Sequence, residues 1–128
     1  MKIQVKQINN TGEVVVKTSI GSLAGMWRYK YGPPIIDFVS YAEIDINTTW
    51  EELTKTHLQN VSSYKVNVTN EKVVFRGMIE DVEEDMVWFR LTEACLIMIN
   101  TDSPAPSLKN EWYELVVDIS SVEIWAYR

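Results

Sequence analysis

Residues 72–92 read KVVFRGMIEDVEEDMVWFRLT, and apolar and polar side chains alternate along most of this stretch. A period of two is typical of β-strands, because successive side chains point to opposite faces of a sheet. We predict strands over 73–80 and 86–92, with the acidic residues 80–85 forming the turn between them. Gly77 lies inside the first strand and favours a bulge or a sharp coil there.

The same alternation continues on both sides of this stretch. It predicts further strands over 2–7, 13–17, 26–31, 39–46, 64–69, 95–100, 112–119 and 122–127. Turn-forming residues separate them, at 9–12, at Gly21 and Gly25, at 32–34, at 70–71 and at 93–94, and a long loop covers 101–110. The only helix we expect is one turn over 50–53, capped by Thr48 or Thr49.

The fold class follows from the number of short strands. Nine or ten of them at regular spacing predict an all-β, mostly antiparallel fold, since open sheet edges invite aggregation and closure removes them. We expect a small closed barrel or sandwich with at most one short helix. The 128 residues fit one β-rich domain over 1–128, with no linker long enough to divide it.

Composition indicates a globular chain. Hydrophobic residues make up 46% and charged residues 23%, close to the globular average. The single cysteine, Cys95, cannot form an intramolecular disulfide, which fits a reducing compartment. Residues 1–16 lack the apolar run of a signal peptide, and no segment is apolar for long enough to cross a bilayer. We therefore expect a cytoplasmic protein with no membrane role.

Charge is unevenly divided along the chain. Residues 1–64 contain six Lys or Arg and six Asp or Glu, whereas residues 65–128 contain six and twelve, so the net charge of −6 belongs to the second half. A negative field repels phosphate backbones and attracts basic surfaces. Nucleic acid is thus an unlikely partner, and a basic protein is the expected one.

The residues give no motif for catalysis, for a metal or for a cofactor. The only histidine, His57, lies in a loop-like run over 55–60 without a nucleophile motif beside it. One histidine and one cysteine cannot supply a zinc site, and residues 80–85 lack the spacing of a calcium loop. We expect no enzymatic activity, no cofactor and no bound metal.

Two tryptophans are candidates for exposed anchors. In 86–92 the apolar residues fall on one face and leave Trp88 and Arg90 on the other, and in 112–119 the same pattern leaves Trp112 and Glu114 opposite the apolar face. Exposed tryptophan among charges is typical of binding hot spots. The alternative is that both rings cover a second apolar layer from the N-terminal half. The predicted partner-binding residues are Glu80, Asp81, Glu83, Glu84, Asp85, Trp88, Trp112 and Glu114.

Aromatic and cationic residues also interleave over 26–31. In a strand, Trp27, Tyr29 and Tyr31 would share one side while Arg28 and Lys30 take the other. A single-strand binder needs stacking rings and phosphate contacts along one groove. We therefore predict that these rings belong to the core or to the barrel wall.

Three segments, 73–82, 87–91 and 113–127, resemble the strand order of an oligonucleotide-binding-type small barrel. The small, acidic, β-rich chain as a whole is similar to bacterial immunity proteins, which neutralise a cognate toxin domain. That resemblance implies a basic, nuclease-like partner, with acidic residues standing where nucleic acid would lie. It assigns no individual residue a role.

The leading hypothesis is a non-catalytic inhibitor, an immunity protein that binds a basic toxin domain. A single-stranded nucleic-acid-binding barrel is the first alternative, and it requires Arg28, Lys30, Arg76 and Arg90 to gather on one surface. A carbohydrate or small-ligand module that uses tryptophan side chains is the second. The identity of the partner and the oligomeric state stay open at this point.

Overall fold

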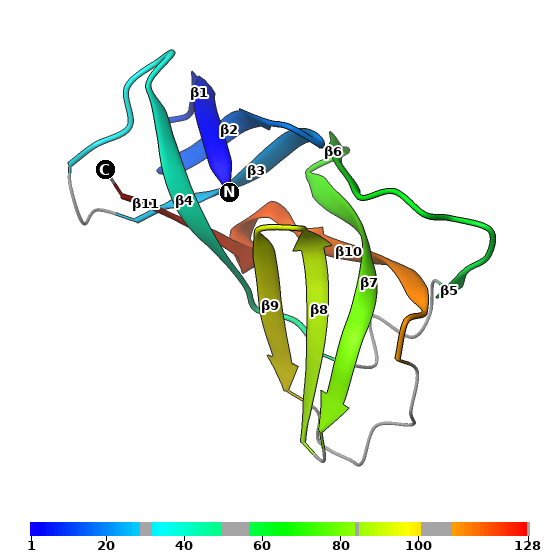
Figure 1. The fold of residues 1–128 in the computed structure, drawn as a ribbon. Coiled ribbons are helices and arrows are strands. Elements are labelled where there is room, and N and C mark those ends of the chain that lie inside the picture. The colour runs from blue at the N-terminus through cyan, green and yellow to red at the C-terminus, as the bar shows by residue number, and fades with distance from the viewer. Residues whose placement is uncertain (29–31, 50–56, 84, 101–108, 128) are drawn as a thin grey trace.

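The computed structural model describes residues 1–28, 32–49, 57–83, 85–100 and 109–127. Within them it contains eleven strands and one 3-10 turn, so the predicted all-β class is confirmed (Figure 1). Most strand pairs are antiparallel, and a single sheet connects all eleven strands. The expected helix over 50–53 lies outside the described residues, as do Tyr29, Lys30 and Tyr31.

Five strands close into a small barrel. These are β1 (Lys2–Ile8), β2 (Glu13–Thr18), β3 (Gly21–Trp27), β4 (Val39–Ile46) and β11 (Val122–Tyr127). The ring runs β1-β2-β3-β11-β4 and returns to β1, and the β3–β11 pair is parallel. The last strand of the chain thus completes a barrel that the first four strands begin.

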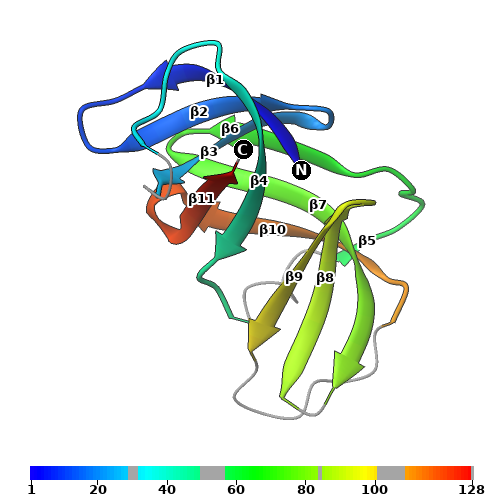
Figure 2. The ribbon, with the colours of Figure 1, turned by 60° about the vertical axis from the view of Figure 1, so that its left-hand side comes forward.

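The remaining strands form a curved extension of the same sheet, which we call the second sheet and whose far end projects away from the barrel in Figure 2. They are β5 (His57–Leu58), β6 (Lys65–Thr69), β7 (Lys72–Glu83), β8 (Met86–Thr92), β9 (Cys95–Asn100) and β10 (Trp112–Asp118). β6 joins the two parts through a parallel contact with β3. The 3-10 turn η1 (Ile119–Ser121) returns the chain from β10 to the barrel.

Gly77 lies where β7 changes neighbours. Before it β7 pairs with β6, and after it β7 pairs with β8, while β10 follows on the other edge up to Met78. A Cβ atom at Gly77 would lie 2.3 Å from the carbonyl oxygen of Arg90, so only glycine allows this crossing. The predicted bulge does not lie at Gly77, because the pairing of β7 with β10 continues through this residue without a shift, and the register shift of β7 falls later, between Ile79 and Asp81.

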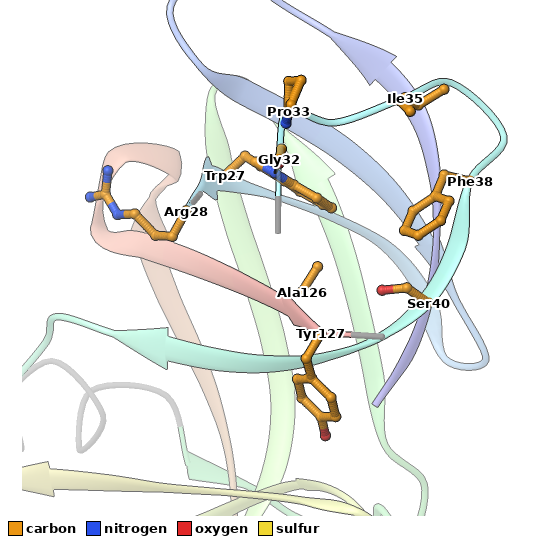
Figure 3. A pocket seen from close by; sticks show the side chains of 9 residues that line it. All are labelled: Trp27, Arg28, Gly32, Pro33, Ile35, Phe38, Ser40, Ala126 and Tyr127. Atoms are coloured by element: carbon orange, nitrogen blue, oxygen red, sulfur yellow. Dashed lines mark hydrogen bonds between the residues drawn. The ribbon is translucent and has the colours of Figure 1, made fainter. Parts of the chain in front are cut away.

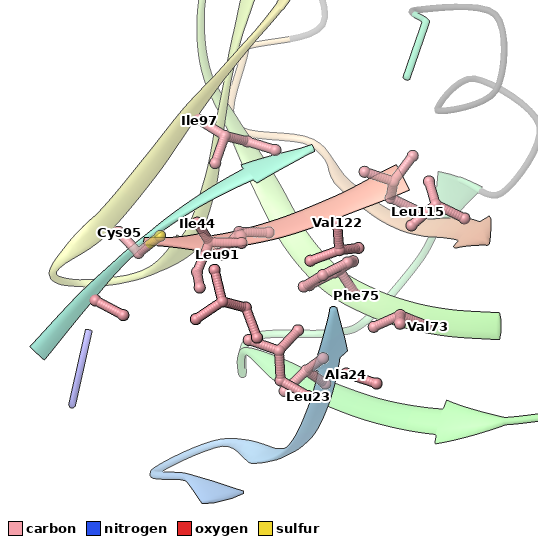
Figure 4. Close-up of a cluster of buried hydrophobic side chains, with 14 of the residues drawn as sticks. Leu23, Ala24, Ile44, Val73, Phe75, Leu91, Cys95, Ile97, Leu115 and Val122 are labelled. Carbon is pink, nitrogen blue, oxygen red and sulfur yellow. The ribbon is translucent and has the colours of Figure 1, made fainter. Parts of the chain in front are cut away.

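One hydrophobic core serves both the barrel and the second sheet (Figure 4). The inward residues of β8 and β10 that the alternation selected are all buried, and Phe75 and Phe89 are the largest side chains with no more than 1% exposure. Among the residues that the structure describes, 26 buried apolar side chains from both parts form this single cluster.

Several local predictions were wrong. The chain turns at Ser19 and Ile20, directly before Gly21, and not between Gly21 and Gly25; both glycines belong to β3, where Gly25 gives room for Val122 of the neighbouring β11. His57 is not in a loop, because β5 pairs with β10. Residues 80–83 continue strand β7, since the charged side chains face outward and the strand need not end, and Asp85 is the turn residue that the structure describes.

The placement of the small barrel was also wrong. The resemblance put an oligonucleotide-binding-type strand order within 72–127, whereas residues 2–46 and 122–127 form the closed ring. Alternation identifies strands but not their partners, and β11 pairs with residues 76 to 97 positions earlier in the chain.

Candidate functional site

Glu80 belongs to an internal ion pair. It stands at the register shift of β7, and its two carboxylate oxygens accept hydrogen bonds from Arg90 Nε at 3.0 Å and Arg90 Nη2 at 2.8 Å. Arg90 Nη1 also donates to the carbonyl oxygens of Thr92 and Glu93. The hydrogen bond to Glu80 raises the pKa of Arg90. Glu80 is therefore neutralised by its own chain and offers little charge to a partner.

The other acidic residues of this stretch point to solvent. Asp81, Glu83 and Asp85 are exposed, and Asp81 accepts a hydrogen bond from the backbone N–H of Val82 at 2.9 Å. Glu84 lies outside the described residues. Three of the predicted carboxylates thus share the far end of the β7–β8 hairpin.

Trp88 and Trp112 lie on the outer face of the second sheet, and both are half-buried. Trp88 is opposite Asp81 on β7 and opposite Met98 on β9. Trp112 is opposite Met78, and its ring centroid lies 5.1 Å from that of Tyr64. The structure thus keeps both rings on the side that alternation predicts, without fully exposing either.

Glu114 stands opposite Arg76 on the same outer face and is half-buried. A register row therefore crosses five strands at one level of this face. It consists of Leu96, Arg90, Met78, Trp112 and Leu58. This row is largely apolar, so the acidic residues of the hairpin end lie beside it rather than within it.

A second surface on the barrel combines exposed aromatic and acidic residues more closely. Along the β4–β11 pair, Tyr41 is opposite Tyr127 and Glu43 is opposite Trp125. The exposed fractions are 57% for Tyr41, 39% for Tyr127 and 38% for Trp125. We call this surface the aromatic–acidic face. Its residues are Tyr41, Glu43, Asp45, Glu123, Trp125 and Tyr127.

The carboxylates of this face differ in their partners. Glu123 Oε2 lies 2.5 Å from Arg28 Nε and is neutralised. Glu43 and Asp45 are exposed, and neither forms an ion pair within the part of the chain that the structure describes. Because charges two residues apart on a strand project to the same side, their fields add.

Glu43 and Asp45 also line a cleft between the barrel and the turn that leads into β9. The cleft has a volume of about 340 Å³, and Ala94, Cys95 and Leu96 form its opposite wall. The amino group of Met1 also lines it and donates to the carbonyl oxygen of Ala42 at 3.1 Å. Burial raises the pKa of the Cys95 thiol, so this thiol is protonated at neutral pH.

The sequence contains part of the signal for this face. Alternation in 39–46 places Glu43 and Asp45 on the outer face. Alternation in 122–127 places Trp125 on the face that does not carry the buried Ile124. What the sequence does not show is that the two strands are neighbours. Only the pairing of β4 with β11 places the carboxylates beside the indole ring.

A small pocket opens at the end of the barrel, between β11, β4 and residues 32–38 (Figure 3). It measures about 50 Å³. Trp27, Ile35, Phe38, Ser40 and Ala126 line it. Trp27 is buried, as predicted for the barrel wall, and its Nε1 donates to the carbonyl oxygen of Gly32 at 3.0 Å.

The cationic residues of the nucleic-acid hypothesis are divided between the two parts. Arg28 lies on the barrel and pairs with Glu123, whereas Arg76 and Arg90 lie on the outer face of the second sheet. Lys30 is outside the described residues. Arg28 and Arg90 are each engaged by a carboxylate.

Within the described ranges, no group of three His, Cys, Asp or Glu side chains is arranged to hold a metal ion. His57 Nε2 lies 2.7 Å from Glu111 Oε2 on the neighbouring segment. No helix in the described part of the chain is long and apolar enough to cross a bilayer. Comparison with protein-family models, with curated proteins and with solved structures found no match to this chain.

Proposed function

We propose that this protein is a non-catalytic inhibitor that binds a cationic protein through the aromatic–acidic face, and that its partner is a toxin domain neutralised in the manner of a bacterial immunity protein. One observation carries the proposal: on the paired strands β4 and β11, Glu43 and Asp45 lie beside the exposed rings of Tyr41, Trp125 and Tyr127. Aromatic anchors and carboxylates in one patch suit a partner that is rich in Lys and Arg.

Two physical effects would cooperate at this face. Glu43 and Asp45, which form no ion pair within the described residues, raise the rate of encounter with a positive surface, because electrostatic steering acts before contact. The rings then determine how long the complex lasts, since most affinity differences between related complexes arise in dissociation. Strands of a closed barrel hold both groups in place, so little conformational entropy is lost on binding.

The residues predicted from the sequence form the second part of the proposal. Asp81, Glu83 and Asp85 extend the negative field at the far end of the β7–β8 hairpin, and Trp88 lies beside them. Glu80 contributes structure rather than affinity, because Arg90 already neutralises it. We rank this surface below the aromatic–acidic face, since its rings are less exposed.

The nucleic-acid alternative has one feature in its favour. The ring order β1-β2-β3-β11-β4 resembles that of oligonucleotide-binding-type barrels, whose ligands lie across the second and third strands. On this barrel the corresponding outer positions hold no aromatic ring. They are Glu13, Val15, Lys17, Ser22 and Met26, and Ala24 between the last two is fully buried. A single-strand binder needs stacking rings there, so the cationic-protein proposal is the better supported.

The test begins with capture at a defined position. A photo-crosslinking amino acid at Tyr41 is expected to trap a protein with an excess of Lys and Arg, and the same group at Ser22, on the other side of the barrel, is expected not to trap it. Affinity for the captured protein is then measured in 50 mM and 300 mM salt. Trapping only acidic or neutral proteins would refute the proposal.

Paired charge reversals identify the surface. Glu43→Lys with Asp45→Lys should weaken binding at least tenfold in low salt and less in high salt, because screening removes the same attraction. Glu83→Lys with Asp85→Lys changes the net charge equally and should have the smaller effect. Equal losses from both pairs would show that only net charge matters and not the face.

A further inference from the structure

The pocket at the end of the barrel is held open by hydrogen bonds of its own chain. Phe38 and Ile35, which form one wall, are placed by the pairs Val5 N–H to Phe38 O at 3.0 Å and Phe38 N–H to Ile35 O at 3.0 Å. The opposite wall is the Trp27 indole, fixed by its hydrogen bond to Gly32. The site is therefore present before any ligand binds, which reduces the cost of filling it.

The polar groups of the pocket already have partners. Trp27 Nε1 donates to Gly32, Ser40 Oγ donates to the carbonyl oxygen of Tyr41, and Arg28 is paired with Glu123. A polar ligand would find the donors of Trp27 and Ser40 already engaged. An apolar group would only have to displace water from between aromatic walls, and burial of apolar surface is favourable.

The rim of the pocket is apolar and open. Ile35 is 63% exposed, and Ile36, Phe38 and Val39 are exposed beside it. Large apolar side chains that surround a pocket on a soluble protein are typical of an interaction site. The pocket also borders the aromatic–acidic face, because Tyr127 lines it and stands opposite Tyr41 on that face.

We propose that this pocket receives one large apolar side chain, phenylalanine or leucine, which the cationic partner presents between basic residues. The inference rests on the proposed function, because charge complementarity at Glu43 and Asp45 selects the partner whose side chain enters the pocket. A volume of about 50 Å³ with an open mouth fits the end of one side chain, and it is too small for a drug-sized ligand. The pocket thus binds the apolar side chain, and the carboxylates bind the basic residues on either side of it.

Short peptides provide the test without knowledge of the partner. The probes are N-acetylphenylalanine amide and N-acetylalanine amide, and the same two residues placed between two lysines. Binding is followed by NMR through the Trp27 indole N–H and the backbone amides of Phe38 and Ala126. Each phenylalanine probe should bind at least tenfold more tightly than its alanine counterpart, and the lysines should improve both.

Variants separate the pocket from the face. Ala126→Leu fills the pocket, and Ile35→Ala removes an exposed part of its rim; each should reduce the preference for phenylalanine at least threefold. Val116→Ala, an exposed control on β10, should not change it. Glu43→Lys with Asp45→Lys should remove the benefit of the lysines and leave the phenylalanine preference intact.

The possible outcomes distinguish the two proposals. Equal binding of the phenylalanine and alanine probes would overturn the pocket inference, whatever the partner is. A phenylalanine preference together with no benefit from the lysines would leave the pocket as an apolar site and would count against the cationic partner.

Discussion

Glu43 and Trp125 stand opposite each other on β4 and β11, an exposed carboxylate beside an indole ring that is 38% exposed. Next to them Tyr41 and Tyr127 form the neighbouring cross-strand pair. Neither β4 nor β11 alone has a distinctive sequence. Their pairing therefore forms one surface on which aromatic rings and carboxylates lie side by side. The proposed function depends on this relationship.

The first prediction concerns Trp125. Trp125→Ala should weaken binding of the captured partner about thirtyfold, roughly 2 kcal/mol, because an aromatic anchor at the centre of an interface contributes on that scale. The free energy of unfolding should fall by less than about 1 kcal/mol, since the ring is already partly exposed. Binding is measured by calorimetry and stability by urea titration. Trp112→Ala is the matched control, and a larger loss of affinity in that variant would assign the interface to the second sheet instead.

Much of the fold could be predicted because it is local. The residues 39–46, 86–92, 95–100 and 122–127 form strands with the predicted bounds, since alternation with a buried face fixes both the strand and its orientation. The acidic run 80–83 was misplaced for a local reason as well. Charge on one side of a long strand is tolerated when that side faces water, so it does not require a turn.

The site could be predicted only in part, because it depends on pairing over long distances. Trp88 and Asp81 are near in sequence, and their hairpin was evident. Tyr41 and Tyr127 are 86 positions apart in the numbering, and no local pattern joins them. The loss of Glu80 from the charged surface has the same origin, since its partner Arg90 is reached only through the β7–β8 register.

The second prediction concerns Gly77. Gly77→Ala should destabilise the protein by about 2 kcal/mol or more, because the new methyl group would meet the carbonyl oxygen of Arg90 at 2.3 Å and the ring of Phe89 at 2.7 Å. Gly12→Ala is the comparison: its nearest neighbour is 3.8 Å away, and only its φ of +85° is unfavourable. Urea titrations should therefore give Gly77→Ala the larger loss. A smaller loss would mean that β7 and β8 can separate at this point at little cost.

The third prediction concerns alkaline pH. Burial raises the pKa of Cys95 from its ordinary 9.0, and burial followed by the charge of Glu111 raises that of Tyr113 from 10.0. Each group keeps its proton longer in the folded state than in the unfolded state. Their stabilising effect is therefore complete below about pH 9 and is lost as the pH rises through the folded-state pKa values, by up to about 1.4 kcal/mol per pH unit for each group.

Urea titrations between pH 7 and pH 11 measure this dependence. Cys95→Ala should remove the loss of stability that begins near pH 9. Tyr113→Phe should remove the loss of stability that begins near pH 10. The Cys95 thiol in the folded chain should react with a disulfide reagent at least 100-fold more slowly than in urea, because it is buried and protonated. Rapid reaction in the folded state would contradict the burial of this side chain.

The last prediction separates structural from binding carboxylates in the acidic stretch. Arg90 is only 21% exposed, and Glu80 holds it in a two-point ion pair. Glu80→Gln leaves that guanidinium without its countercharge and should cost about 1 kcal/mol of stability, a value kept low because Glu80 itself is 39% exposed. Glu83→Gln and Asp85→Asn, on exposed side chains of the same hairpin, should change stability by less than about 0.5 kcal/mol.

The affinity for the partner should show the reverse order. Glu80→Gln should leave the affinity unchanged, because Arg90 already neutralises this carboxylate, and the other two substitutions should lower it slightly. If Glu80→Gln weakened binding without lowering stability, the ion pair with Arg90 would open when the partner binds, and Glu80 would belong to the interface as its sequence position first indicated.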